Sequence, residues 1–365
     1  MPYATSAPCS YVFPKKLQKS HDLTDSLNCS FTALPMTFWL DFACSWVNPF
    51  LQFEPAVSQK PTVAHASSVA QVPEGQLTSA RFRDAAGEYM DYQLFVPTRL
   101  SKKALPLVVM LHGYSQELDS FITGTSMNKA AAAAGFAVLY PAQSSRSHPQ
   151  KCWHWFDPAH QHRDLGEPAL LAAVTRSVIQ TQPIDPRRVY VAGLSAGGAM
   201  ATVMGREYPD LFAGVGVHSG LAVGVAHNVA SALASMRGEL PAPRAHSVAI
   251  PTIVFHGDAD GTVHRDNGER VISACTGSTT VAEEQQLHVN ERQCTRRLHR
   301  RKNGTVLAEH WIIHRAGHAW SGGSSRGSYA DSHGPDASAE MLRFFAEQLS
   351  MQRKTSSRQK AHLRH

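Results

Sequence analysis

The chain has few cysteines and lacks long apolar runs. Its six cysteines are scattered and none belongs to a Cys-x-x-Cys pair, which excludes a dense disulfide framework and the common zinc-binding pattern. Cys275 and Cys294 would bridge a loop if the protein were exported, but their spacing does not establish a pairing. No apolar run approaches the ~20 residues that span a bilayer. Residues 1–35 also lack the charged start, apolar stretch and cleavage site of a signal peptide, so they give no indication of export.

Charged residues are also sparse, at 18% of the chain, and the net charge lies mainly at one end. The formal net charge is +6, and residues 351–365 carry five positive charges and no negative one. The rest of the chain is therefore close to neutral. We expect no nucleic-acid partner, and we interpret 351–365 as a solvated basic tail.

Changes in composition divide the chain into parts. Residues 1–78, rich in Ser, Pro and Thr, form a poorly defined N-terminal extension that ends in a linker at Gln59–Ser79. Its segment 36–53 is rich in aromatic residues. This segment either contacts a membrane, granule or polymer surface, or docks on the body of the same protein, and its shortage of Lys and Arg favours docking. Residues 79–350 alternate strand-like and helix-like segments, which predicts an α/β fold with a mostly parallel sheet and helices on both faces.

The expected elements of residues 79–350 follow from apolar runs and helical periodicity. Continuous apolar runs indicate strands buried on both faces, whereas alternation that stops at Pro97 indicates an antiparallel edge strand. The expected strands are Tyr89–Val96 (the edge strand), Leu105–Leu111, Phe136–Tyr140, Val189–Val191, Phe212–Val217, Thr252–Phe255 and Ala308–His314. The expected helices are Ser126–Ala134, Glu167–Gln180 and Asp336–Leu349.

One strand leads into a glycine-rich turn. Gly193-Leu194-Ser195-Ala196-Gly197 fits Gly-x-Ser-x-Gly, between the strand Val189–Val191 and a helix-compatible run. Such a turn holds its central serine in a strained conformation, raises the hydroxyl above the sheet and directs helical N–H groups at the same point. The pattern predicts that Ser195 is a nucleophile. The alternative is a turn whose serine caps the following helix.

A serine nucleophile needs a base to remove its proton and a carboxylate to orient that base. Two aspartates follow the strand Thr252–Phe255, and Asp260 fits the pattern His-Gly-x-x-Asp-x-x-Val better than Asp258 does. Asp258 is then expected to shape the loop. His318 lies between the strand Ala308–His314 and a glycine-rich loop, and is the expected base. The histidines at other strand ends, His112 and His256, are expected to shape loops.

Further residues are expected around these three. The backbone N–H groups of Ala196 and Tyr114 would bind the oxyanion that forms when an ester is attacked. Trp153, Trp155 and Trp320 lie near these loops, and exposed rings there would contact an apolar or flat group of the substrate. The alternative for Trp153 is a place in the core.

Several stretches together are more specific than the serine turn alone. They are Leu111-His112-Gly113, Cys152-Trp153-His154-Trp155-Phe156, Gly193–Met200, Tyr208–Phe212, His218-Ser219-Gly220, Gly317–Gly323 and Gly334–Ala337. On these stretches, residues from about 80 to 347 resemble the polyhydroxybutyrate depolymerase-type esterases, α/β-hydrolases that include feruloyl and acetylxylan esterases. The resemblance implies a serine esterase with Ser195, Asp260 and His318 as its triad, no cofactor and no metal. It implies an acyl-enzyme formed from short hydroxyalkanoate or aryl esters, and an extracellular location, with a cytoplasmic one as the alternative.

The chain departs from this family pattern in two places. Tyr114 stands where members often have a cysteine, so Cys152 would lack its usual partner. Only the basic tail follows residue 350, where secreted polymer depolymerases add a polymer-binding module, so attack on solid polymer is not expected. A feruloyl or acetylxylan-type esterase is an alternative. An alternative of another class is a binding protein on an esterase scaffold that contacts a granule through 36–53. The sequence does not indicate an oligomeric state.

Overall fold

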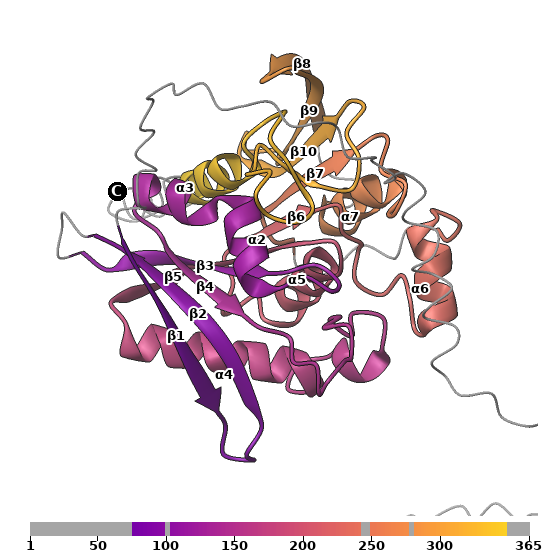
Figure 1. Ribbon diagram of the computed structural model, residues 1–365. Coiled ribbons are helices and arrows are strands. Elements are labelled where there is room, and N and C mark those ends of the chain that lie inside the picture. Colours follow the sequence, from indigo (N-terminus) through magenta and orange to yellow (C-terminus); the bar gives the residue numbers. More distant parts are fainter. Residues whose placement is uncertain (1–74, 99–102, 242–248, 277–280, 349–365) are drawn as a thin grey trace, which may run out of the picture. The chain divides into compact units, whose positions relative to one another are not determined.

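The computed structural model of the protein describes residues 75–98, 103–241, 249–276 and 281–348. Their centre is a ten-stranded sheet with the order β1-β2-β4-β3-β5-β6-β7-β10-β9-β8 (Figure 1). Its strands are β1 Gly75–Arg83, β2 Tyr89–Pro97, β3 Leu105–Leu111, β4 Ala137–Pro141, β5 Ile184–Leu194, β6 Val215–His218, β7 Thr252–Gly257, β8 Val281–Val289, β9 Arg292–Arg300 and β10 Val306–Ile313. A short pair, β11 Trp320–Ser321 and β12 Ala330–Asp331, lies outside this sheet.

The middle of the sheet is parallel. Strands β4, β3, β5, β6, β7 and β10 each run parallel to their neighbours within this group. The antiparallel strands are β1 and β2 at one edge and β9 and β8 at the other. Because the carboxyl ends of parallel strands meet at one edge of a sheet, the loops after β3, β5, β7 and β10 lie along that edge.

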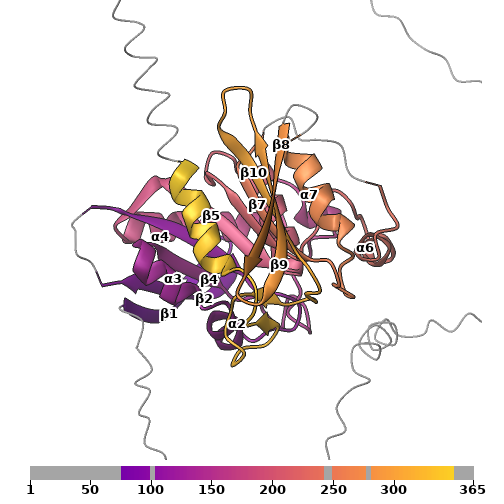
Figure 2. The ribbon, with the colours of Figure 1, turned by 90° about the horizontal axis from the view of Figure 1, so that it is seen from above.

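Helices cover both faces of the sheet. They are α2 Leu118–Thr125, α3 Met127–Ala134, α4 Gly166–Thr181, α5 Ala196–Glu207, α6 Val229–Met236, α7 Asp266–Thr276 and a last helix over 337–348. Figure 1 shows α4 and α3 on opposite sides of the strands, and Figure 2 shows α3 and the last helix (yellow) in front of them. The predicted α/β architecture is confirmed.

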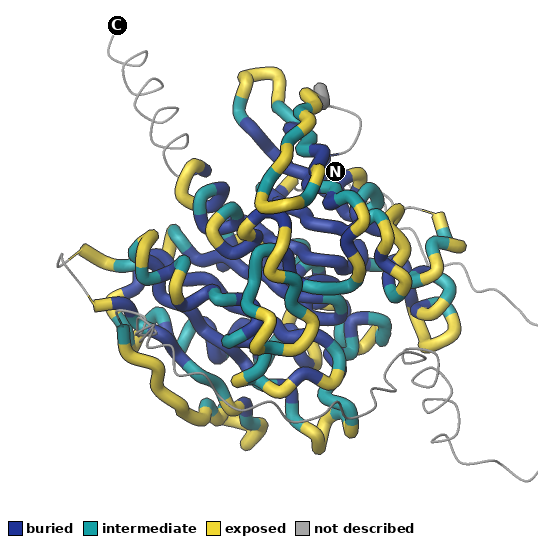
Figure 3. Tube along the Cα trace, turned by 45° about the horizontal axis from the view of Figure 1, so that its top comes forward, coloured by how far each residue is buried: buried dark blue, intermediate teal, exposed yellow. Residues whose placement is uncertain are grey.

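Successive residues of the central strands alternate between two apolar cores. In β3, Val109 and Leu111 pack with α4 and α5, whereas Val108 and Met110 pack with α2, α3 and the last helix. Side chains of a strand point alternately to its two faces, so a strand covered on both sides needs apolar residues at every position. Figure 3 shows the buried segments in the interior and the exposed ones at loops and edges.

The first strand corrects two predictions. β1 begins at Gly75, inside the expected linker Gln59–Ser79. It pairs with β2 along its whole length, with Gly75 opposite Pro97 and Arg83 opposite Tyr89. β2 is therefore not the edge strand, because it also pairs with β4. Most β1 side chains are exposed, so backbone pairing holds the strand and no apolar pattern marks it.

The hairpin of β8 and β9 was not predicted from the sequence. Its strands are rich in charged residues, and ion pairs such as Arg297 to Glu284 (2.8 Å) and Arg300 to Glu283 (3.1 Å) join them. Asn290 and Glu291 form the turn, both with positive φ, as two-residue hairpin turns require.

Three predictions fall partly or wholly outside the described residues. The N-terminal extension 1–78 lies there except for its last four residues, and the aromatic segment 36–53 and the basic tail 351–365 lie there entirely. The division of the chain into these parts stays a prediction. No helix among the residues described is long and apolar enough to cross a membrane.

Candidate active site

Ser195 lies in a sharp turn between β5 and α5. Its φ of 55° and ψ of −118° are unfavourable for a residue with a side chain, and its N–H donates to the carbonyl of His218 at 2.9 Å. A Cβ at Gly197 would overlap the carbonyl oxygen of Leu111, and one at Gly193 would overlap Gly197. Glycine is therefore required on both sides of Ser195 for β3, β5 and α5 to approach so closely.

The buried Asp260 and the partly buried His318 form a close pair at the same edge of the sheet. The Nδ1 atom of His318 lies 2.7 Å from Oδ2 of Asp260. The other carboxylate oxygen of Asp260 accepts the N–H groups of Thr262 (2.9 Å) and Val263 (2.8 Å). Burial acts to raise the pKa of Asp260, but its hydrogen bond and charge interaction with His318 outweigh burial and lower that pKa. Asp260 is therefore a carboxylate suited to holding a protonated Nδ1 on His318.

The competing aspartate contacts a different histidine. Oδ2 of Asp258 lies 2.7 Å from Nδ1 of His314, and Oδ1 accepts the N–H of Arg315 at 2.6 Å. Asp258 thus fixes the end of β10, which agrees with the loop-shaping role expected for it. Of the two aspartates, the geometry brings Asp260 to His318.

Backbone hydrogen bonds hold the loop of Asp260 against the loop of His318. The N–H groups of Asp258 and Ala259 donate to the carbonyls of Ile313 and Ala316, both at 3.1 Å. A Cβ at Gly257 would overlap Ala316, so the two loops touch along their backbones. The relative position of acid and base is consequently set by main-chain contacts.

His218 connects the serine turn with the loop of His318. Its carbonyl accepts the N–H of Ser195, and its Nε2 accepts the N–H of Ser321 at 3.0 Å. The ring is fully buried between Phe255 and Trp320, and burial lowers its pKa to about 3. It is therefore neutral and able to accept this bond. In the sequence, His218 was noted only within the stretch His218-Ser219-Gly220, to which no role was assigned.

The expected oxyanion donors lie at the ends of two neighbouring strands. Ala196 is the first residue of α5, so its N–H has no partner within the helix. Tyr114 lies after β3, where Leu111 is paired with Gly193 of β5. In this loop the N–H of Gly113 donates to Gln116 Oε1 at 2.8 Å. Both donors remain predictions.

The three tryptophans are buried, which corrects the expectation of exposed rings. Trp153 and Trp320 are 0% and 1% exposed, and Trp155 is also buried. The indole N–H of Trp153 donates to the carbonyl of His112 at 3.0 Å, and that of Trp320 donates to Ser338 at 3.1 Å. The expected contact with substrate required exposed rings, and these rings are buried. We therefore propose that the three rings support the loops of the site by packing beneath them.

The described cysteines are free thiols. Cys152, Cys275 and Cys294 are all buried, and Cys275 and Cys294 do not form the disulfide that an exported protein would allow. Burial raises the pKa of Cys152 and of Cys275 to about 12, so neither is a reactive thiolate.

One group of side chains among the described residues has donor atoms close enough to hold a metal ion. It consists of His154, His160 and Glu167, whose ligand atoms lie within 4.8 Å of one another. None of the three belongs to the predicted catalytic set.

Comparison with known proteins identifies relatives of part of the chain. The family model "Esterase PHB depolymerase" matches residues 90–282. The chain is 30% identical over 236 residues to poly(3-hydroxyalkanoate) depolymerase C of Paucimonas lemoignei, covering 61% of this chain and 56% of that protein. It is 34% identical over 129 residues to feruloyl esterase B of Neurospora crassa, covering 35% and 43%. It is 31% identical over 157 residues to an acetylxylan esterase of Coprinopsis cinerea, covering 42% and 41%.

The chain therefore spans about half the length of these curated relatives. Among solved structures, the acetyl xylan esterase from Aspergillus awamori matches with a TM-score of 0.56 and 18% identity, over 74% of this chain and 100% of that one. This likeness confirms the α/β-hydrolase fold. Because the family model covers more than half of the sequence, the chain belongs to the esterase PHB depolymerase family.

Proposed function

We propose that the protein is a serine carboxylic-ester hydrolase with Ser195, Asp260 and His318 as its triad. The observation that carries the proposal is the 2.7 Å contact of Asp260 with His318. Their loops are joined by backbone hydrogen bonds at the edge of the sheet where the carboxyl ends of the parallel strands meet. Ser195, in its strained turn, follows β5 at the same edge. A neutral histidine oriented by a buried carboxylate is the base that a serine hydroxyl requires. The family relationship supports this assignment.

The proposed reaction proceeds through an acyl-enzyme. Nε2 of His318 removes the proton of the Ser195 hydroxyl while Oγ attacks the ester carbonyl carbon. The N–H groups of Ala196 and Tyr114 bind the negative oxygen of the tetrahedral intermediate. The intermediate collapses, and His318 returns the proton to the departing alcohol. Water then repeats the sequence on the acyl group, with His318 as base, and releases the acid and free Ser195.

We propose short esters as substrates, either hydroxyalkanoate oligomers of the polyhydroxybutyrate type or short-chain and aryl esters. Feruloyl or acetylxylan-type esters are the alternative, because the relatives include proteins named for both activities. Hydrolysis rates for hydroxybutyrate oligomers, methyl ferulate and acetylated xylan fragments, measured side by side, distinguish the two. A kcat/KM at least about tenfold higher for the hydroxybutyrate oligomers supports the first proposal, and the reverse order supports the second.

Replacement of the nucleophile tests the reaction type. Ser195→Ala is expected to lower the hydrolysis of p-nitrophenyl butyrate by about 10⁴-fold or more. Ser325→Ala removes the same atom from an exposed serine in the loop after His318 and should leave the rate unchanged. Circular dichroism establishes that both variants fold. A folded Ser195→Ala variant with most of its activity would exclude Ser195 as the nucleophile.

We propose an extracellular site of action, with a cytoplasmic one as the alternative. The name of the relative from Paucimonas lemoignei refers to a polymer substrate, and a polymer does not cross membranes. The buried free thiols, on the other hand, are usual in reducing compartments. Immunoblots of culture medium and cell lysate decide between the two, and protein confined to the lysate would contradict the proposal.

A further inference from the structure

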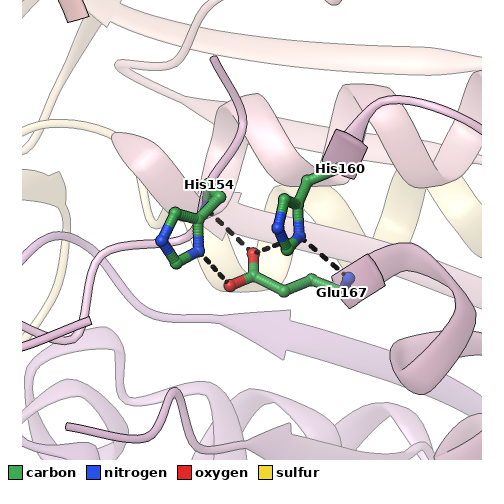
Figure 4. A group of neighbouring side chains, drawn as sticks. All are labelled: His154, His160 and Glu167. Atoms are coloured by element: carbon green, nitrogen blue, oxygen red, sulfur yellow. Dashed lines mark hydrogen bonds and ion pairs between the residues drawn. The ribbon is translucent and has the colours of Figure 1, made fainter. Parts of the chain in front are cut away.

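A cluster of two histidines and a glutamate lies between β4 and α4, outside the proposed triad. His154 lies in the loop that follows β4, and His160 ends the short 3-10 helix η1 Pro158–His160 within that loop. Glu167 is in the first turn of α4. Nδ1 of His154 lies 2.6 Å from Oε1 of Glu167, and Nδ1 of His160 lies 4.0 Å from Oε2. The two imidazole rings are stacked with centroids 4.8 Å apart. Figure 4 shows both rings directed at the carboxylate.

The carboxylate of Glu167 is buried and accepts several hydrogen bonds. Its side chain is 7% exposed. It accepts hydrogen bonds from the side-chain amide of Gln143 and from the N–H of His154, the latter at 2.8 Å. Its ion-pair partners in the described part of the chain are the two imidazoles, which are charged only when protonated. A buried carboxylate is stable when a positive charge compensates it, and either a protonated imidazole or a bound metal ion supplies that charge.

We propose that His154, His160 and Glu167 form a binding site for a divalent ion of the zinc type. Two imidazole nitrogens and one carboxylate oxygen are a donor set that zinc prefers. A tetrahedral ion with bonds of about 2.0–2.1 Å needs ligand atoms about 3.3 Å apart. The present atoms lie within 4.8 Å of one another and would have to move closer together on binding. The two imidazoles are partly exposed, at 20% and 23%. Water would complete the coordination.

Each ligand has a defined starting arrangement. Nδ1 of His160 accepts the N–H of Glu167 at 3.0 Å, so this nitrogen carries a lone pair and exchanges that bond for the ion. Nδ1 of His154, in contact with the carboxylate, binds the ion as the imidazole proton moves to Nε2. A Cβ at residue 166 would lie 2.6 Å from Nδ1 of His160, so Gly166 leaves space for the ring.

The cluster is connected to the loop after β3 by Gln143. The side-chain amide of Gln143 donates to Glu167 and, at 2.9 Å, to the carbonyl of Cys152. The backbone N–H of Gln143 donates to Nε2 of His112 at 3.1 Å. His112 begins the loop that carries Tyr114. A bound ion would therefore stiffen the loop of the proposed oxyanion donor; this last step rests on the proposed function, whereas the binding of the ion does not.

Metal titration of the chelator-treated full-length protein tests the proposal without any substrate. Calorimetry with Zn²⁺ is expected to show one equivalent bound with a dissociation constant on the order of micromolar or tighter. Co²⁺ should give the visible absorption of a tetrahedral site. His154→Gln and His160→Gln should each weaken Zn²⁺ binding by at least about tenfold. His162→Gln removes an exposed histidine of the same loop and should bind like the parent protein.

Glu167→Gln completes the series, with folding checked by circular dichroism because this side chain is buried. If Glu167→Gln does not fold, His154→Gln and His160→Gln decide whether the cluster binds zinc, because the two histidine side chains are partly exposed and their replacement should not prevent folding. Absence of stoichiometric Zn²⁺ binding to the parent protein overturns the proposal. So does binding that His154→Gln and His160→Gln leave unchanged. A variant that loses zinc binding but keeps full ester hydrolysis, or one that keeps zinc binding but loses hydrolysis, shows that the zinc site and the triad are separate proposals that can fail independently.

Discussion

Replacement of Asp260 by asparagine tests the triad geometry most sharply. Oδ1 of Asp260 accepts two backbone N–H groups, so the amide oxygen of asparagine stays on that side and its NH₂ group faces His318. Nδ1 of His318 must then accept a hydrogen bond, which moves the imidazole proton to Nε2, where the lone pair is needed. Loss of the base in this way lowers kcat by about 10⁴-fold, equivalent to about 5 kcal/mol of transition-state stabilisation.

Asp258→Asn provides a matched control. Asp258 also lies 2.7 Å from a histidine nitrogen, but this histidine is His314, which precedes His318 in the loop after β10. With p-nitrophenyl butyrate as substrate, we expect Asp258→Asn to change kcat by less than about tenfold, because it alters only the support of the loop. The reasoning is refuted if Asp258→Asn loses several orders of magnitude and a folded Asp260→Asn variant does not.

Two further predictions concern stability. Burial lowers the pKa of His112 to about 4 and that of His218 to about 3, from 6.5, so the unfolded chain binds more protons than the folded one below pH 6.5. The unfolding temperature should fall as the pH decreases from 6.5 toward 4, and a constant value across this range would contradict the burial of neutral imidazoles. Gly197→Ala should cost about 2–4 kcal/mol of unfolding free energy in urea titrations because its Cβ overlaps neighbouring backbone. Gly261→Ala, where a Cβ meets open space, should change it by less than about 0.5 kcal/mol; equal losses in both variants would refute the steric explanation.

The centre of the fold was predictable because its signals are local. A parallel strand covered on both faces needs a continuous apolar run, as in Leu105–Leu111, and such runs stand out in the sequence. The turn at Ser195 was visible for the same reason, since close approach of backbones demands glycine on both sides. The preference for Asp260 over Asp258 came from a loop pattern, and the structure pairs Asp260 with His318.

The remaining features depend on contacts between distant parts of the chain. β1 and the hairpin of β8 and β9 are held by backbone pairing and cross-strand ion pairs, which leave no apolar periodicity. Trp153 stands in a predicted loop, but its ring is buried and its N–H donates to the carbonyl of His112. The approach of His160 to Glu167 depends on the fold of the loop and on the space at Gly166, which no spacing rule encodes.

The most direct measurement is covalent labelling of the nucleophile. A fluorophosphonate probe reacts with an activated serine hydroxyl and not with an ordinary one. Peptide mass spectrometry of the labelled full-length protein should place one adduct on Ser195, and Asp260→Asn should slow the labelling strongly. An unlabelled protein, or an adduct on another serine, would contradict the assignment of Ser195 as the nucleophile.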